Sequence, residues 1–230
     1  MQLKMTGYRY FPYDLKKACY MTPEEIYLAS VKTNGQEQYY SMDNNTFLKR
    51  LEEREVVYSD TGCFRYIYIR GAHEPFIYEA HCAQTEDHSY ESSIEFCVQI
   101  AGAYLQKLKT AGVYDNTAIV ILADHGYADD NASFGRQNPA LFIKGAGEKH
   151  AFQFSDIPLS HEDLQGIFLR LLDGAESTAV SVWQEGDQRE RRFLFFEYED
   201  EEHMTEYFQL GSAGDEETMV ASGNTYNLKS

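Results

Sequence analysis

The stretch GVYDNTAIVILADHG, residues 112–126, carries the strongest structural signal in the chain. Its apolar run, 117–123, is rich in β-branched residues and predicts a strand that is buried on both faces, as parallel strands between helices are. The strand ends on Asp124, His125 and Gly126. A carboxylate beside an imidazole suits a zinc- or manganese-like divalent cation. The same residues also suit a plain turn, in which Asp124 caps the next segment and His125 is exposed.

Helices and strands alternate along the rest of the chain. Apolar periodicity and end signals predict helices over 22–33, 45–54, 89–110 and 161–173. Aromatic and β-branched runs predict strands over 63–71, 117–123, 140–145 and 192–199. This alternation is typical of an α/β three-layer sandwich with a largely parallel central sheet. Ligands of such sheets bind at the carboxyl ends of the strands, so we expect His73 and Asp124-His125 on the same edge.

The two longest predicted helices have recognisable faces and ends. In the helix over 89–110, the apolar residues that recur at helical spacing on one face are Ile94, Val98, Ala101, Leu105 and Leu108. Gly112 follows this helix and ends it. Ser160 is the expected N-cap of the helix over 161–173, and Gly174 is its expected stop.

Composition and charge limit the kinds of partner. The chain has 230 residues, 43% of them hydrophobic, which is enough for one sizeable domain with a core. A net charge of −17 argues against nucleic acid and anionic membranes, because both would repel the protein. It does not exclude a phosphate or sulfate ester, since a bound cation reverses the local field. No apolar run approaches the ~20 residues that span a bilayer.

Four cysteines are spread along the chain: Cys19, Cys63, Cys82 and Cys97. None of them forms a Cys-x-x-Cys pair, which argues against a zinc knuckle or a thioredoxin-type site. Four free thiols and two disulfides are both compatible with this count.

The segment 112–126 closely resembles the metal-binding segment of the sulfatase-like branch of the alkaline phosphatase superfamily. In that family a buried strand ends in an Asp-His-Gly ligand pair. Three further stretches resemble the family in the expected order: IRGAHEPF at 69–76, GRQNPALFIKG at 135–145 and SDIPLSHEDLQGIFLRLLDG at 155–174. The end of the chain is compatible with the terminal strands of the same group, which includes phosphoethanolamine and glycerophosphate transferases.

The resemblance implies an alkaline-phosphatase-like fold that is N-terminally truncated. The partial domain would have a helical lead-in over 1–62, an α/β core over 63–174 and C-terminal strands over 175–230. Relatives mostly work outside the cytoplasmic membrane and are often anchored to it, so the parent protein is expected there too.

The resemblance also implies roles for individual residues. Asp124 and His125 would bind a catalytic divalent metal, either Mn, Zn, Ca or Mg. His73 would contact the transferring phosphoryl or sulfuryl group, or protonate the leaving oxygen. The alternative for His73 is a loop histidine that Pro75 holds in place. Arg136 could hold an anion, with a surface ion pair as the alternative.

Enzymes of this family use a threonine, serine or modified cysteine nucleophile near the start of the domain, beside a further acidic metal ligand. Neither group can be identified before His73: Thr6 and Thr22 qualify by residue type alone, and Thr22 suits a helix cap. Ser160 is likewise expected to be a cap, and His161 a residue of the first helical turn.

We therefore expect this chain to supply part of the site of a metal-dependent hydrolase or transferase. The missing N-terminal part of the domain would complete the site, and the chain alone should turn over little ester. The alternative is a degenerate, non-catalytic homologue that serves as a binding or structural module.

Overall fold

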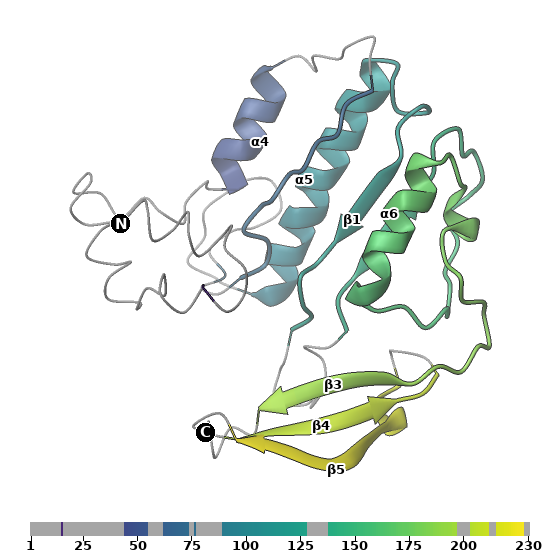
Figure 1. The fold of residues 1–230 in the computed structure, drawn as a ribbon. Coiled ribbons are helices and arrows are strands. Elements are labelled where there is room, and N and C mark those ends of the chain that lie inside the picture. The colour runs from purple at the N-terminus through teal and green to yellow at the C-terminus, as the bar shows by residue number, and fades with distance from the viewer. Residues whose placement is uncertain are drawn as a thin grey trace. The chain divides into compact units, whose positions relative to one another are not determined.

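The computed structural model describes residues 15, 44–54, 62–73, 76, 89–127, 138–196, 203–211 and 215–227. These residues belong to two compact units, Met1–Ala111 and Gly112–Ser230 (Figure 1). The described helices are α4 (Asn44–Glu53), α5 (Tyr90–Thr110) and α6 (Leu164–Leu172), with short 3₁₀ turns η3 (His161–Asp163), η4 (Ser177–Ala179) and η5 (Glu216–Thr218). The described strands are β1 (Ile119–Leu122), β2 (Leu141–Lys144), β3 (Arg191–Phe196), β4 (His203–Gln209) and β5 (Met219–Asn227). The helix predicted over 22–33 lies outside the described residues.

In the first unit, α4 lies along α5, and both helices were predicted (Figure 1). Leu48 of α4 packs against Phe96 and Ile100 of α5, and all three are at most 2% exposed. Ser89 caps α5 by accepting a hydrogen bond from the backbone N–H of Ser92 at 3.0 Å, which satisfies one of the free donors of the first turn. At the other end the chain leaves α5 through Gly112, whose φ of +71° is a left-handed conformation that glycine adopts without strain.

The buried face of α5 differs from the predicted one. The core contains Phe96 and Ile100, whereas Val98 of the predicted stripe is 65% exposed and Ile94 is 38% exposed. Leu108 belongs to the predicted stripe and is buried. Because α5 has apolar residues on more than one side, its periodicity did not select a face. The position of Leu48 on α4 selected it.

The central sheet is not parallel, which corrects the predicted fold class. β1 pairs with β2 in antiparallel register, with Ile119 opposite Lys144 and Leu122 opposite Leu141. The described residues form mixed α/β structure with two antiparallel sheets, one of two strands and one of three, and no parallel central sheet. An apolar run is compatible with a neighbour in either direction, because direction is set by the connection between the strands. The burial of β1 on both faces is also not observed, since Ile121 and Leu122 are 36% and 40% exposed.

The strand predicted over 63–71 is wrong as well. Residues 62–70 have no regular secondary structure, and no described strand pairs with them. Ile69 packs against the core of the first unit, but Phe64 and Tyr66 are 80% and 78% exposed. High β propensity is realised only where a neighbouring strand accepts the backbone hydrogen bonds. His73 was placed on the same sheet edge as Asp124 and His125 because a strand was expected to lead to it. Since that strand is absent, the reason for this placement is lost.

The second unit has its core between α6 and the two-stranded sheet. Ile167 and Leu171 of α6 are buried with Val180, and Val120 of β1 and Ile143 of β2 pack against them. Lys144 at the end of β2 donates to three backbone carbonyls of the turn before β1, those of Tyr114 (3.2 Å), Asp115 (3.4 Å) and Thr117 (3.1 Å). It also donates to the carbonyl of the next residue, Gly145, at 3.0 Å. The predicted helix over 161–173 is confirmed as η3 followed by α6, and Gly174 follows it with a φ of +87°.

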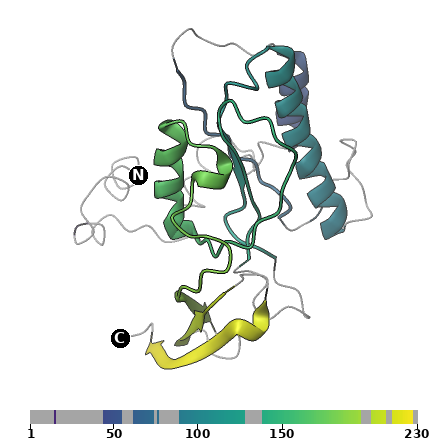
Figure 2. The same ribbon diagram turned by 90° about the vertical axis from the view of Figure 1, so that its right-hand side faces the viewer.

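Strands β3, β4 and β5 form an antiparallel sheet, of which β3 was predicted. Between Thr205 and Tyr207 the register with β5 shifts, and Figure 2 shows the bend in β5. Asn224, which lies in the bulge, and Tyr226 donate hydrogen bonds of 2.9 Å and 3.1 Å to the buried carboxylate of Glu206. Such bulges re-aim side chains, and here they satisfy a buried acid.

The packing of α5 yields a direct test with two identical side chains. Ile100→Ala should lower the free energy of unfolding by about 2–4 kcal/mol, because it leaves a cavity in the core. Ile94→Ala removes the same atoms from a more exposed position and should cost about 1 kcal/mol. Urea unfolding followed by far-UV circular dichroism measures both. Equal losses would contradict the assigned buried face.

Candidate functional site

The end of β1 presents Asp124 and His125 to solvent side by side. Their side chains are 72% and 41% exposed, respectively. Asp124 Oδ1 accepts a hydrogen bond from the backbone N–H of His125 at 3.0 Å, which fixes the carboxylate relative to the following residue. The second carboxylate oxygen, Oδ2, is not used in this bond. The two residues lie at the end of β1, at the edge of the two-stranded sheet.

The orientation of the His125 ring bears on metal binding. Its Nδ1 lies 2.7 Å from the carbonyl oxygen of Gly126, and a carbonyl oxygen accepts only, so Nδ1 is the donor. In the neutral ring, Nε2 therefore carries the lone pair. A backbone carbonyl on the other ring nitrogen is the usual way in which proteins orient a metal-binding histidine.

The two donor atoms are also suitably spaced. His125 Nε2 and Asp124 Oδ1 are 3.9 Å apart. Two ligands at about 2.1 Å from a tetrahedral zinc ion are roughly 3.4 Å apart, so small side-chain rotations bring both atoms within reach of one ion. The donor set, one carboxylate oxygen and one imidazole nitrogen, fits a divalent metal. At 3.9 Å the same atoms also form an ion pair when the imidazole is protonated.

The structure does not relate the other predicted site residues to this pair. His73 is exposed and belongs to the first unit. Arg136 lies outside the described residues. Across the parts of the chain that the structure describes, no group of three or more His, Cys, Asp or Glu side chains is arranged to hold a metal ion. Asp124 and His125 thus offer two metal ligands, and the described residues provide no third His, Cys, Asp or Glu ligand beside them.

One further histidine reaches the same strand end. His161 begins the turn that leads into α6, and its Nε2 lies 3.2 Å from the carbonyl oxygen of Ala123. The N–H of Ala123 donates to the carbonyl of Ala140 at 3.0 Å, so this residue is bound on both sides. The sequence motif Ser-His-x-x places His161 at the start of a helix, but no local signal shows that its ring contacts β1.

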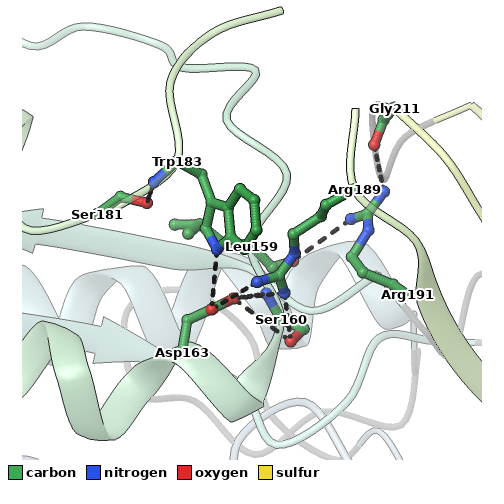
Figure 3. A network of polar contacts seen from close by, with 8 residues as sticks. All are labelled: Leu159, Ser160, Asp163, Ser181, Trp183, Arg189, Arg191 and Gly211. Atoms are coloured by element: carbon green, nitrogen blue, oxygen red, sulfur yellow. Dashed lines mark hydrogen bonds and ion pairs between the residues drawn. The ribbon is translucent and has the colours of Figure 1, made fainter. Parts of the chain in front are cut away.

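The start of α6 is held by a network around Asp163 that sequence reasoning missed (Figure 3). Arg189 donates to both carboxylate oxygens of Asp163 at 2.7 Å, and the indole N–H of Trp183 donates to Oδ1 at 3.3 Å. The backbone N–H of Ser160 donates to Oδ2 at 2.7 Å, and completes the capping box of the turn. Ser160 is therefore a helix cap, as predicted.

The charges in this network are largely withdrawn from water. The side chains of Arg189 and Asp163 are 13% and 16% exposed. Burial raises the pKa of Asp163, but the hydrogen bonds from Arg189 and from the Ser160 N–H outweigh it and hold the pKa below its ordinary value. Removing one partner of such a buried pair costs about 3–5 kcal/mol, because it leaves the other charge unpaired.

Arg191 lies beside this pair and enters β3. Its residue is 4% exposed, and its guanidinium donates to the backbone carbonyls of Leu159, at 3.4 Å, and Gly211 (Figure 3). Burial, and then the charge of Arg189, lower the pKa of Arg191. Together the two arginines connect the start of α6 to the three-stranded sheet of the same unit.

A second buried carboxylate, Glu148, joins the loop after β2 to the loop after α6. It accepts from the N–H of Gly145, from the N–H of Ser177 at 3.1 Å and from the Ser177 hydroxyl, and it contacts His150 Nε2. The loops approach so closely that a Cβ on Gly145 would lie 2.6 Å from the carbonyl oxygen of Ala175. The Ser177 hydroxyl donates to the carboxylate of Glu148 and not to His150. These residues therefore hold the two loops together and do not form a serine nucleophile with a histidine base.

The pKa of Glu148 reflects these contacts. Burial raises it, but the hydrogen bonds from Ser177, Gly145 and His150 outweigh burial and bring the pKa to about 2. The pKa of His150 is raised by its contacts with the Ala151 carbonyl and with Glu148. In the sequence, Glu148 is one acid among many in a polar turn, so no signal distinguished it.

Of the four cysteines, Cys63 and Cys97 are described, and both are free thiols. Burial raises the pKa of Cys97 to about 11, so its thiol stays protonated at neutral pH. Neither thiol lies among the residues assigned to the site.

Comparison with known proteins finds no relative: no family model, curated protein or solved structure matches the chain at a significant level. In the described residues, no helix is both long enough and apolar enough to cross a membrane.

The carboxylate of Glu148 can be tested by replacing it with the uncharged Gln. Glu148→Gln should cost about 2 kcal/mol of unfolding free energy at pH 7, because the buried donors lose a charged acceptor. The folded-state pKa of about 2 lies below the ordinary value of 4.5, so the contribution is present above pH 4.5 and is lost as the pH falls toward 2. Urea unfolding at several pH values should show the difference from wild type shrinking over that window.

The matched control is Glu162→Gln, which removes an exposed carboxylate of the same unit. The difference in unfolding free energy between Glu162→Gln and wild type should be small and should not shrink between pH 4.5 and pH 2. A Glu148→Gln difference that stays constant down to pH 2.5 would contradict the assigned role.

Proposed function

We propose that the end of β1 binds a divalent metal ion and forms part of the site of a hydrolase or transferase acting on phosphate or sulfate esters. The observation that carries the proposal is the orientation of His125. Its Nδ1–H donates to Gly126 at 2.7 Å, which leaves the Nε2 lone pair for a metal, beside the carboxylate of Asp124. Both side chains are exposed, so a substrate can approach the ion.

Asp124 and His125 are the residues that would hold the metal. When bound, a divalent ion neutralises charge on the ester oxygens and polarises them for attack. Asp124 would supply a negative charge to the site, whereas the Nε2 lone pair of His125 would coordinate the ion without adding charge. A divalent ion with one carboxylate ligand would keep a net positive charge. That charge would attract an anionic ester, although the whole chain carries a net charge of −17.

His73 is proposed as the residue that contacts the transferring group or protonates the leaving oxygen. Its exposure is compatible with that role, since a general acid must reach the substrate. Support for the reaction class comes from the resemblance of segments 69–76, 112–126, 135–145 and 155–174 to sulfatase-like enzymes, in the order in which they occur there.

Metal binding by the full chain is the first test. Titration with Mn²⁺, followed by the loss of the free-ion electron paramagnetic resonance signal, should show one bound ion per chain. Asp124→Ala and His125→Ala should each weaken the binding by at least 10-fold, because each removes one of two protein ligands. The control Asp156→Ala removes an exposed carboxylate of the same unit and should leave the affinity within about 2-fold of wild type.

The outcomes separate the two functional readings. Binding that both ligand variants weaken supports the metal site. Absence of Mn²⁺ and Zn²⁺ binding by the wild-type chain, or equal weakening by Asp156→Ala, overturns the proposal and favours the non-catalytic homologue.

A further inference from the structure

The contact between His161 and Ala123 joins two segments that are 38 residues apart in sequence. His161 Nε2 lies 3.2 Å from the Ala123 carbonyl oxygen, and because that oxygen only accepts, Nε2 carries the proton and donates it. Ala123 is the residue directly before Asp124. The contact therefore acts on the backbone from which the metal-ligand pair extends.

Within the described residues, few other contacts hold the strand end. β1 ends at Leu122, and in the described part of the chain the last backbone bond beyond the ladder runs from the Ala123 N–H to the Ala140 carbonyl. Past this point, Asp124 and His125 bond to each other and to Gly126, which are local contacts. The hydrogen bond from His161 to the Ala123 carbonyl, by contrast, comes from a segment that is distant in sequence.

The position of His161 is in turn well determined. Its neighbour Ser160 is fixed by Asp163, which accepts from the Ser160 N–H at 2.7 Å, and Arg189 donates to the Ser160 hydroxyl at 3.0 Å (Figure 3). Arg189 also stacks over the Trp183 ring at 4.7 Å. A buried ion pair thus fixes the turn from which His161 reaches the strand.

We infer that His161 is a positioning residue for the Asp124–His125 pair: by donating to the Ala123 carbonyl, it holds the peptide that precedes Asp124 and sets the direction of both ligands. This inference rests on the proposed metal site. Hydrogen-bond partners outside the ligand set commonly affect metal affinity by 10–100-fold. Because His161 acts through one backbone group, we expect an effect near 10-fold.

The experiment compares His161→Ala with His161→Gln in the full chain. Ala removes the donor, whereas Gln retains an N–H donor on a side chain of similar reach. In the Mn²⁺ titration, His161→Ala should weaken binding about 10-fold, and His161→Gln should stay within about 3-fold of wild type. Glu162→Gln, an exposed change in the same turn, should have no effect.

A second measurement needs no metal. Amide hydrogen exchange of Ala123 should accelerate about 10-fold in His161→Ala, whereas the amide of Gly147, bonded to the Asp115 carbonyl at 2.6 Å, should be unchanged. This pattern separates a local release of the strand end from general loss of stability.

The two measurements separate the two proposals. If the wild-type chain binds no Mn²⁺ but the exchange pattern appears, the metal site fails and the contact with Ala123 stands as a structural one, so the positioning role is overturned with it. If Asp124→Ala abolishes binding while His161→Ala binds normally, the inference alone is overturned. Equal weakening by His161→Ala and His161→Gln also overturns it, since a donor would then not be the decisive feature.

Discussion

The carboxylate of Asp163 joins several segments of the second unit, because it accepts hydrogen bonds both from its own turn and from groups that are distant in sequence. Arg189 binds it through two nitrogens, Trp183 through its indole, and Ser160 through its backbone N–H. These donors offset the cost of burying the charge, which an isolated carboxylate could not meet. The start of α6 and the chain leading into β3 are consequently held together. The direction of the His161 side chain depends on this arrangement.

Glu148 likewise holds together the loop after β2 and the loop after α6. Both buried acids are satisfied by several donors, some of them backbone N–H groups, and both have a pKa below the ordinary value. The chain has a net charge of −17, and most carboxylates of the described residues are exposed and contribute little to stability. Among the described residues, Asp163 and Glu148 hold loops together, and this is where charge contributes to the fold.

The candidate metal site is connected to the Asp163 network through His161 and does not include that network. Asp124 and His125 are exposed, and their own contacts are local. The strand end that carries them is bound to Ala140 on one side and to His161 on the other. The route from Arg189 through Asp163 and His161 to Ala123 gives a physical reason for an exposed ligand pair to be preorganised.

The sequence by itself determined the helices α4, α5 and α6, the strands β1 to β3, the cap at Ser160, and the pairing of a carboxylate with an imidazole after β1. These features follow from periodicity, turn residues and end groups, which act over a few residues. The tertiary structure alone decided that β1 and β2 are antiparallel, that α5 buries Phe96 and Ile100 in preference to Val98, that 62–70 forms no strand, and that His161 reaches Ala123. Each of these depends on which distant segment lies alongside, and an apolar or charged residue is compatible with several such neighbours until the chain has folded.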